Sequence, residues 1–131
     1  MKQSYSIPTT KHFNPVSDPK MVCTCCGGGG LSITILILLE LLKQHFNGKA
    51  VIIHSGARCA KHNAQEGGAK NSEHKFTEEE PLVDVADIHI EGVSPQELYM
   101  FVKSLPFANL LGIGKYKTFV HVDTRGYAAR W

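Results

Sequence analysis

Two short segments alternate aliphatic and polar residues with a period of two, and they constrain the fold more than any other feature. The segments are VDVADIHI, residues 83–90, and TFVHVDTR, residues 118–125. Successive side chains of a β-strand point to opposite faces, so each segment predicts a strand with one apolar face and one face bearing Asp and His. If both apolar faces cover the same core, Asp87 and His121 project together on the other side of the sheet.

A further histidine, His74, lies in the loop before the first of these strands and can reach the same side. His74, Asp87 and His121 would supply three protein ligands, the number typical of a catalytic zinc site whose fourth position stays open for water. Asp84 is the alternative carboxylate, but the alternation places it with the aliphatic residues and favours Asp87. Spacing alone is also compatible with a surface His74 and a structural His121.

The remaining segments predict a mixed fold. The clearest helix is SPQELYMFVKSL, in which Ser94 is the expected N-cap, Pro95 the first helical residue and Glu97 the partner in a capping box. We also expect a buried helix over 31–46, a strand over 50–55, a long functional loop over 56–80, and a hairpin of strands 110–116 and 118–125.

This order predicts an α+β domain with a small antiparallel sheet flanked by helices. The first 22 residues are rich in Pro, Ser and Thr. We expect residues 1–22 to form an N-terminal arm and residues 23–131 to form a single domain.

The charge and hydropathy patterns exclude several classes of partner. The net charge of the 131 residues is only +2, without a concentrated basic segment, which argues against a nucleic-acid binder. The longest apolar run, residues 31–42, is too short to cross a bilayer. The N-terminus lacks the apolar core of a signal peptide. We therefore expect a monomer, synthesised in the cytoplasm, with no nucleic-acid or membrane partner.

Four cysteines occur, three of them in the segment CTCC at residues 23–26 and the fourth at Cys59. The segment lacks the paired CxxC motifs of a structural zinc site, and no pair of histidines follows at zinc-finger spacing. Two interpretations stay open. The thiols are reduced, or Cys59 forms a disulfide with one of the three N-terminal cysteines.

The segments SGARCAKHNAQEGGAKNSEH, VADI and GIGKYKTFVHVDTRG, with the terminal ARW, resemble the M15 peptidases in residue type and in order. These are zinc D-Ala-D-Ala carboxypeptidases and related peptidoglycan peptidases of phages and bacteria. The resemblance runs from the helix at residue 31 to Trp131. It implies a fold like that of the hedgehog signalling domain and the D-Ala-D-Ala peptidases.

The resemblance implies a role for each matching residue. His74, Asp87 and His121 match the zinc ligands. Arg58 matches the arginine that polarises the substrate carbonyl, and a fixed guanidinium suits the negative charge that develops there. The resemblance also implies substrate contacts for two further residues, which are Ser72 and Tyr116.

The sequence departs from the family pattern at two places. Twelve residues, 75–86, separate His74 from Asp87, and the family glycine in this interval is missing. The inserted TEEEPL leaves room for Asp84 or for the carboxylates of Glu78–Glu80 to approach the metal. Thr118 stands where many relatives carry the carboxylate that acts as general base. Asp123 is the nearest substitute and Glu78–Glu80 the other, although Asp123 could instead orient His121 or pair with Arg125.

The resemblance implies a zinc peptidase that cuts the stem peptides of peptidoglycan, at D-Ala-D-Ala as a carboxypeptidase or at L-Ala-D-Glu as an endopeptidase. It would act on the cell wall, for example as a phage endolysin released through a holin. The alternative is a zinc-binding, cell-wall-associated module of the same fold without turnover, as the hedgehog domain illustrates.

Overall fold

The computed structural model describes residues 5–68 and 72–131, so residues 1–4 of the expected arm lie outside the described part. A five-stranded sheet forms its centre, in the order β2-β4-β6-β5-β7. The strands are β2 (Val51–Ser55), β4 (Val85–Ile90), β5 (Gly112–Lys115), β6 (Val120–Asp123) and β7 (Ala129–Arg130). All neighbouring strands are antiparallel except β5 and β7, which pair in parallel.

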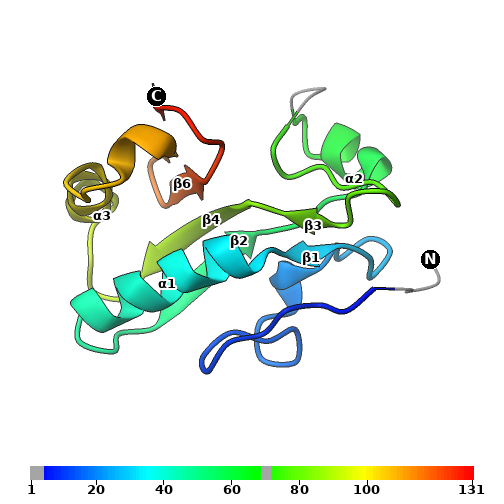
Figure 1. Ribbon diagram of the computed structural model, residues 1–131, viewed down its shortest axis with the longest axis horizontal. Coiled ribbons are helices and arrows are strands. Elements are labelled where there is room, and N and C mark those ends of the chain that lie inside the picture. Colours follow the sequence, from blue (N-terminus) through cyan, green and yellow to red (C-terminus); the bar gives the residue numbers. More distant parts are fainter. Residues whose placement is uncertain (1–4, 69–71) are drawn as a thin grey trace.

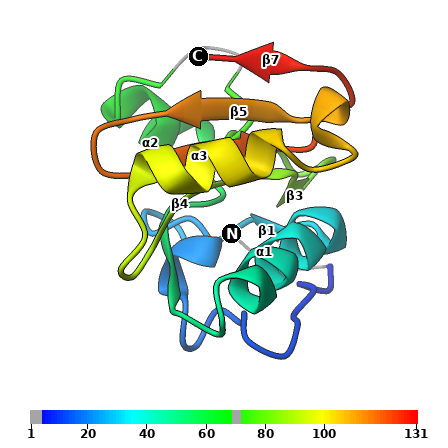
Figure 2. The same cartoon turned by 90° about the vertical axis from the view of Figure 1, so that its left-hand side faces the viewer.

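Two helices cover the apolar side of this sheet (Figures 1 and 2). The first, α1 (Ile33–His45), buries most of its aliphatic residues, and α3 (Pro95–Lys103) packs against β4, β5 and β6. The helices meet where the ring of His45 stacks on Phe101, with centroids 3.6 Å apart. The aliphatic side chains of β4 and β6 are buried against them, namely Ala86, Ile88, Ile90, Val120 and Val122.

Local chemistry sets the helix boundaries. Ser94 caps α3, where its Oγ accepts a hydrogen bond from the backbone N–H of Glu97 at 3.1 Å. Ser32 caps α1 in the same way through the N–H of Ile35. Helix α1 therefore begins at Ile33, two residues later than residue 31, where the sequence predicted it.

The α+β class with a small, largely antiparallel sheet is confirmed, with corrections at the level of elements. The predicted loop over 56–80 contains a short helix, α2 (Ala60–Gln65). Leu31 belongs to β1 (Gly30–Leu31), which pairs in parallel with β3 (Leu82–Val83). Asp84 interrupts the predicted strand over 83–90, so that β3 and β4 are separate.

The N-terminal segment packs onto the domain rather than away from it. Phe13 is 2% exposed and Met21, in the short 3-10 helix Pro19–Met21, is fully buried. A second 3-10 helix, Ala108–Leu110, leads into β5. Among the described residues, no helix combines the length and the apolar character needed to cross a membrane.

Candidate metal centre

The pairing of β4 with β6 brings an aspartate and a histidine together. Asp87 and His121 are direct cross-strand partners, on the face of the sheet opposite the helices. The Nδ1 atom of His121 lies 2.9 Å from Oδ1 of Asp87. The alternation of the two sequences placed both residues on this face, and the register of the sheet places them opposite one another.

His74 reaches the pair from the segment that follows α2. This segment is held by Arg58, whose backbone N–H donates to the carbonyl of His74 and whose carbonyl accepts from Phe76. His74 is 2% exposed. Its Nδ1 lies 2.7 Å from the carbonyl oxygen of Gly56, which can only accept, so Nδ1 carries the proton and Nε2 presents a lone pair.

The Nε2 atom of His74 is the feature that points to a cation. It is buried and has no hydrogen-bond partner among the described residues. Oδ2 of Asp87 lies 3.2 Å away, but the two atoms are not oriented as a hydrogen bond. A buried lone pair without a donor is costly unless another group satisfies it.

The three ligand atoms of His74, Asp87 and His121 fit one metal ion. All lie within 4.8 Å of one another. Nitrogen and oxygen ligands at about 2.0–2.2 Å from a tetrahedral zinc lie roughly 3.4 Å apart. Oδ1 of Asp87 lies 2.9 Å from Nδ1 of His121, and Oδ2 lies 3.2 Å from Nε2 of His74, so each carboxylate oxygen is close to that separation from one imidazole.

The surroundings of the centre favour a positive charge. Burial acts to raise the pKa of Asp87, but the hydrogen bond with His121 and the adjacent imidazole of His74 outweigh it and lower the pKa to about 2. Burial acts to lower the pKa of His121, but hydrogen bonds to Asp123 and Asp87 raise it. Two ionised carboxylates thus flank the imidazole of His121.

Asp123 lies behind His121 rather than beside the open side of the centre. Its Oδ2 is 2.7 Å from Nε2 of His121, and the side chain is fully buried. Arg125 donates to both oxygens of Asp123, at 2.7 Å each. An imidazole whose second nitrogen donates to a carboxylate is the arrangement that orients metal-binding histidines in proteins.

A cleft of about 680 Å³ opens onto the side chains of His74, Asp87 and His121 and is lined also by Arg58, Ser72 and Tyr116. Arg58 lines this cleft, and its Nε atom is buried without a partner among the described residues. Ser72 accepts a hydrogen bond from the N–H of His74 at 3.2 Å, which supports the loop. Tyr116 stacks on Phe119, with centroids 4.6 Å apart.

Comparison with known proteins decides the family. A family model described as Peptidase M15 matches residues 16–123, most of the chain. The chain belongs to the M15 peptidase family. No curated protein and no solved structure shows a significant match to it.

The other carboxylates that the sequence offered to the metal of this M15 peptidase lie away from His74, Asp87 and His121. Asp84 is exposed at the break between β3 and β4, where its carbonyl accepts from Thr124. The inserted residues Glu78–Glu80 are exposed, and a turn between Thr77 and Glu80 holds them. None of these carboxylates belongs to the His74–Asp87–His121 group or to the described lining of the cleft.

Sequence reasoning missed several cleft residues of this M15 peptidase. Trp131 donates from Nε1 to the hydroxyl of Tyr116 at 2.7 Å, and its ring lies 4.8 Å from that of His121. Glu73 also lines the cleft. In the sequence, only the position of Glu73 next to His74 could have indicated its place in the cleft. For Trp131 the only indication was the terminal ARW motif.

Proposed function

We propose that this M15 peptidase is a zinc enzyme that hydrolyses peptide bonds in the stem peptides of peptidoglycan. The observation that carries the zinc assignment is the buried, unpartnered Nε2 of His74, which lies beside Asp87 and His121. The family match supports peptide-bond hydrolysis. The peptidoglycan substrate rests on the resemblance of the motifs.

The residues of the cleft have separable tasks in this proposal. His74, Asp87 and His121 would hold the ion, and Asp123 would keep the proton of His121 on Nε2. When bound, zinc acts as a Lewis acid and lowers the pKa of water from about 15.7 to about 7. Arg58 would donate to the carbonyl oxygen of the scissile bond, where negative charge develops.

The general base has to be assigned to a residue other than Asp123. Asp123 was expected as general base, but both of its oxygens are engaged by His121 and Arg125 and it is buried. We assign it a positioning role instead. Glu73 lines the cleft and is exposed, so it can reach water and a leaving amine.

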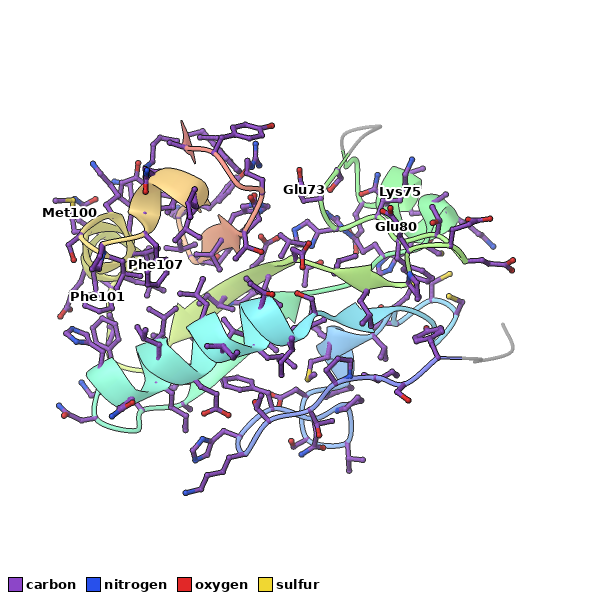
Figure 3. All side chains as sticks on the ribbon, viewed as in Figure 1. Glu73, Lys75, Glu80, Met100, Phe101 and Phe107 are labelled. Carbon is purple, nitrogen blue, oxygen red and sulfur yellow. The ribbon has the colours of Figure 1, made fainter. Side chains whose placement is uncertain are left out.

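Glu73 and Glu80 make a matched pair for testing this assignment. Figure 3 shows Glu73 on the side of its loop nearest the C-terminal segment and Glu80 farther away, towards α2. We expect Glu73→Gln to lower kcat by roughly 10²–10⁴-fold with zinc retained, as for loss of a general base. Glu80→Gln should leave kcat unchanged. Equal activity of both variants would remove Glu73 from the mechanism.

The substrate is tested with purified peptidoglycan and mass spectrometry of the products. Release of D-Ala identifies a carboxypeptidase, and new N-terminal D-Glu identifies an endopeptidase. Either product should disappear in His121→Ala and after treatment with a chelator. A protein that carries zinc at this centre but releases neither product from peptidoglycan would contradict the proposed activity.

A zinc-binding module without turnover is the second candidate function. One observation favours it: Thr118 replaces the carboxylate that many relatives use as general base, and Asp123 does not take its place geometrically. In that case the protein would bind peptidoglycan fragments in a zinc-dependent manner and Glu73→Gln would not change the affinity.

A further inference from the structure

A second group of metal-binding side chains lies outside the cleft. The sulfur atoms of Cys23, Cys26 and Cys59 all lie within 4.8 Å of one another. Cys23 and Cys26 come from the loop before β1, whereas Cys59 is the N-cap of α2. The fold therefore joins a C-x2-C pair to a third cysteine that is distant in sequence.

The loop around Cys23 has the shape needed to present two sulfurs to one side. The N–H of Gly27 donates to the carbonyl of Cys23 at 2.7 Å, and the N–H of Cys23 donates to Gly28 at 2.8 Å. Gly27 has φ of 77°, a conformation that glycine adopts without steric cost. The chain thus turns immediately after Cys26.

His62 brings a fourth donor next to one of the three sulfurs, that of Cys23. Its Nδ1 lies 3.4 Å from Sγ of Cys23, close to the roughly 3.6 Å expected between sulfur and nitrogen ligands of one tetrahedral zinc. Its other nitrogen, Nε2, lies 3.2 Å from a carboxylate oxygen of Glu66. A carboxylate on the far nitrogen orients a metal-binding imidazole, as Asp123 does for His121.

Backbone N–H groups point at the sulfurs. The N–H of Cys59 donates to Sγ of Cys23, and the N–H of His62 donates to Sγ of Cys59, both at 3.4 Å. Burial acts to raise the pKa of Cys23, but N–H donors, first that of Cys59 and then that of Cys26, lower it to about 6. These donors stabilise thiolate, the form of cysteine that binds metals.

We propose that Cys23, Cys26, Cys59 and His62 bind a structural zinc ion, separate from the ion of the cleft. Thiolate and imidazole ligands select zinc among the common divalent ions, and a set of four protein ligands leaves no position for a substrate. The sequence argued against such a site because the chain lacks a second CxxC pair and a pair of histidines at zinc-finger spacing. The fold instead supplies Cys59 and His62, from the start of α2.

The position of the site indicates a structural role for the ion. It would tie the loop before β1 to the beginning of α2, directly after Arg58. Arg58 lines the cleft, so the ion would fix the backbone that carries this arginine. A disulfide could tie the same two segments, but it would use only two of the three sulfurs in the group.

The first experiment measures zinc per chain by mass spectrometry after purification of the full chain under reducing conditions. We expect two ions in the wild type, one in Cys26→Ser and two in Cys25→Ser. Cys25 is the matched control, since it lies in the same exposed turn and interacts with Cys59 without belonging to the group of three sulfurs. His74→Ala should also hold one ion. If Cys26→Ser loses no zinc relative to the wild type, the proposal is wrong.

The second experiment distinguishes the two centres and excludes a disulfide without changing any cysteine. Cobalt bound to the wild type should show the charge-transfer absorption of thiolate ligands, and His74→Ala should keep it. Denaturation with a chelator should release four reactive thiols per chain. Absence of the thiolate band, or only two reactive thiols in protein purified without reductant, would overturn the proposal while leaving the cleft assignment intact.

Discussion

At the scale of single residues, two aspartates three positions apart have different surroundings. Asp87 lies between His74 and His121, whereas Asp84 is exposed. We expect Asp87→Ala to lose the cleft zinc and Asp84→Ala to keep it, as measured by zinc content per chain. Because a second zinc site is proposed, both variants are best measured in the Cys26→Ser background. Retention of zinc in Asp87→Ala would mean that another residue completes the centre.

Asp123 is a second residue whose environment predicts a measurable effect. Its carboxylate orients His121 and pairs with Arg125. Asp123→Asn should weaken zinc binding by roughly 10–100-fold, as for other partners of metal-binding histidines. It should also destabilise the fold by about 3 kcal/mol, because Arg125 is left without its charge partner. Competition with a zinc chelator measures the first effect and urea unfolding measures the second.

The same carboxylate predicts a pH dependence for the metal-free protein. Burial acts to raise the pKa of Asp123, but hydrogen bonds from Arg125 and His121 hold it below its ordinary value. A carboxyl group with a depressed pKa in the folded state stabilises the protein above its unfolded pKa of about 3.9, and this contribution is lost as the pH falls further. In Asp123→Asn the free energy of unfolding should therefore fall less steeply below about pH 4 than in the wild type. Asp84→Asn, at an exposed position, should leave the acid profile as in the wild type.

The residue scale also shows what the sequence could predict. Alternation identified the face of Asp87 and His121, because side-chain direction in a strand follows from position alone. It could not decide between a catalytic and a positioning role for Asp123, because that depends on where Arg125 folds back. The buried Nε2 of His74 was equally out of reach, since it results from the hydrogen bond to Gly56.

At the scale of elements, the glycines of β5 make room for the centre. Gly112 lies opposite Asp123 and Gly114 opposite His121. A Cβ atom at Gly112 would lie 2.5 Å from Oδ2 of Asp123 and from Nε of Arg125. We expect Gly112→Ala to displace this ion pair and to weaken zinc binding at least as much as Asp123→Asn does. Lys115→Ala, on the same strand but exposed, is the control. Wild-type zinc affinity in Gly112→Ala would show that the pair can move without consequence.

The N-cap of α3 allows a second prediction at this scale. Its substitution should change the free energy of unfolding without changing the metal centre. Ser94→Ala removes the acceptor for the N–H of Glu97 and should cost about 1 kcal/mol of unfolding free energy. Ser94→Gly should cost only a few tenths. Urea unfolding measures both, and zinc content should stay at the wild-type level, because α3 lies on the face of the sheet opposite the centre.

The elements that the sequence predicted well are those with a local signal. Ser94, Pro95 and Glu97 mark the start of α3, and that helix begins where expected. Helix α2 was missed because its cap is a cysteine, Cys59, and because it is short. The parallel pairs β1–β3 and β5–β7 join segments far apart in sequence, and β1, β3 and β7 are only two residues long, which leaves no periodic pattern to detect in them.

At the scale of the whole molecule, the cleft is assembled from three distant parts of the chain. Arg58 and His74 come from the segments around α2, Asp87 and His121 from the central strands, and Trp131 from the end that follows β7. The motifs pointed to Arg58, His74, Asp87 and His121, which the structure brings to this cleft, but not to Glu73 or Trp131. Only the packing shows that the parallel pairing of β7 with β5 carries Trp131 to the rim beside His121.

Trp131 therefore offers a test of whether the assembled cleft, rather than the metal centre alone, selects the substrate. Its indole lies near the ring of His121 and over Arg125, and it bonds to the hydroxyl of Tyr116. We expect Trp131→Ala to raise KM for peptidoglycan fragments by roughly 3–10-fold, since an aromatic contact contributes about 0.5–1.5 kcal/mol. Zinc content should stay unchanged. Trp131→Phe keeps the ring without the N–H, so it should recover most of the affinity if stacking dominates. A fall in kcat and in zinc content, with KM unaltered, would instead mean that Trp131 positions His121. Substrate binding would then depend on Arg58 and Tyr116.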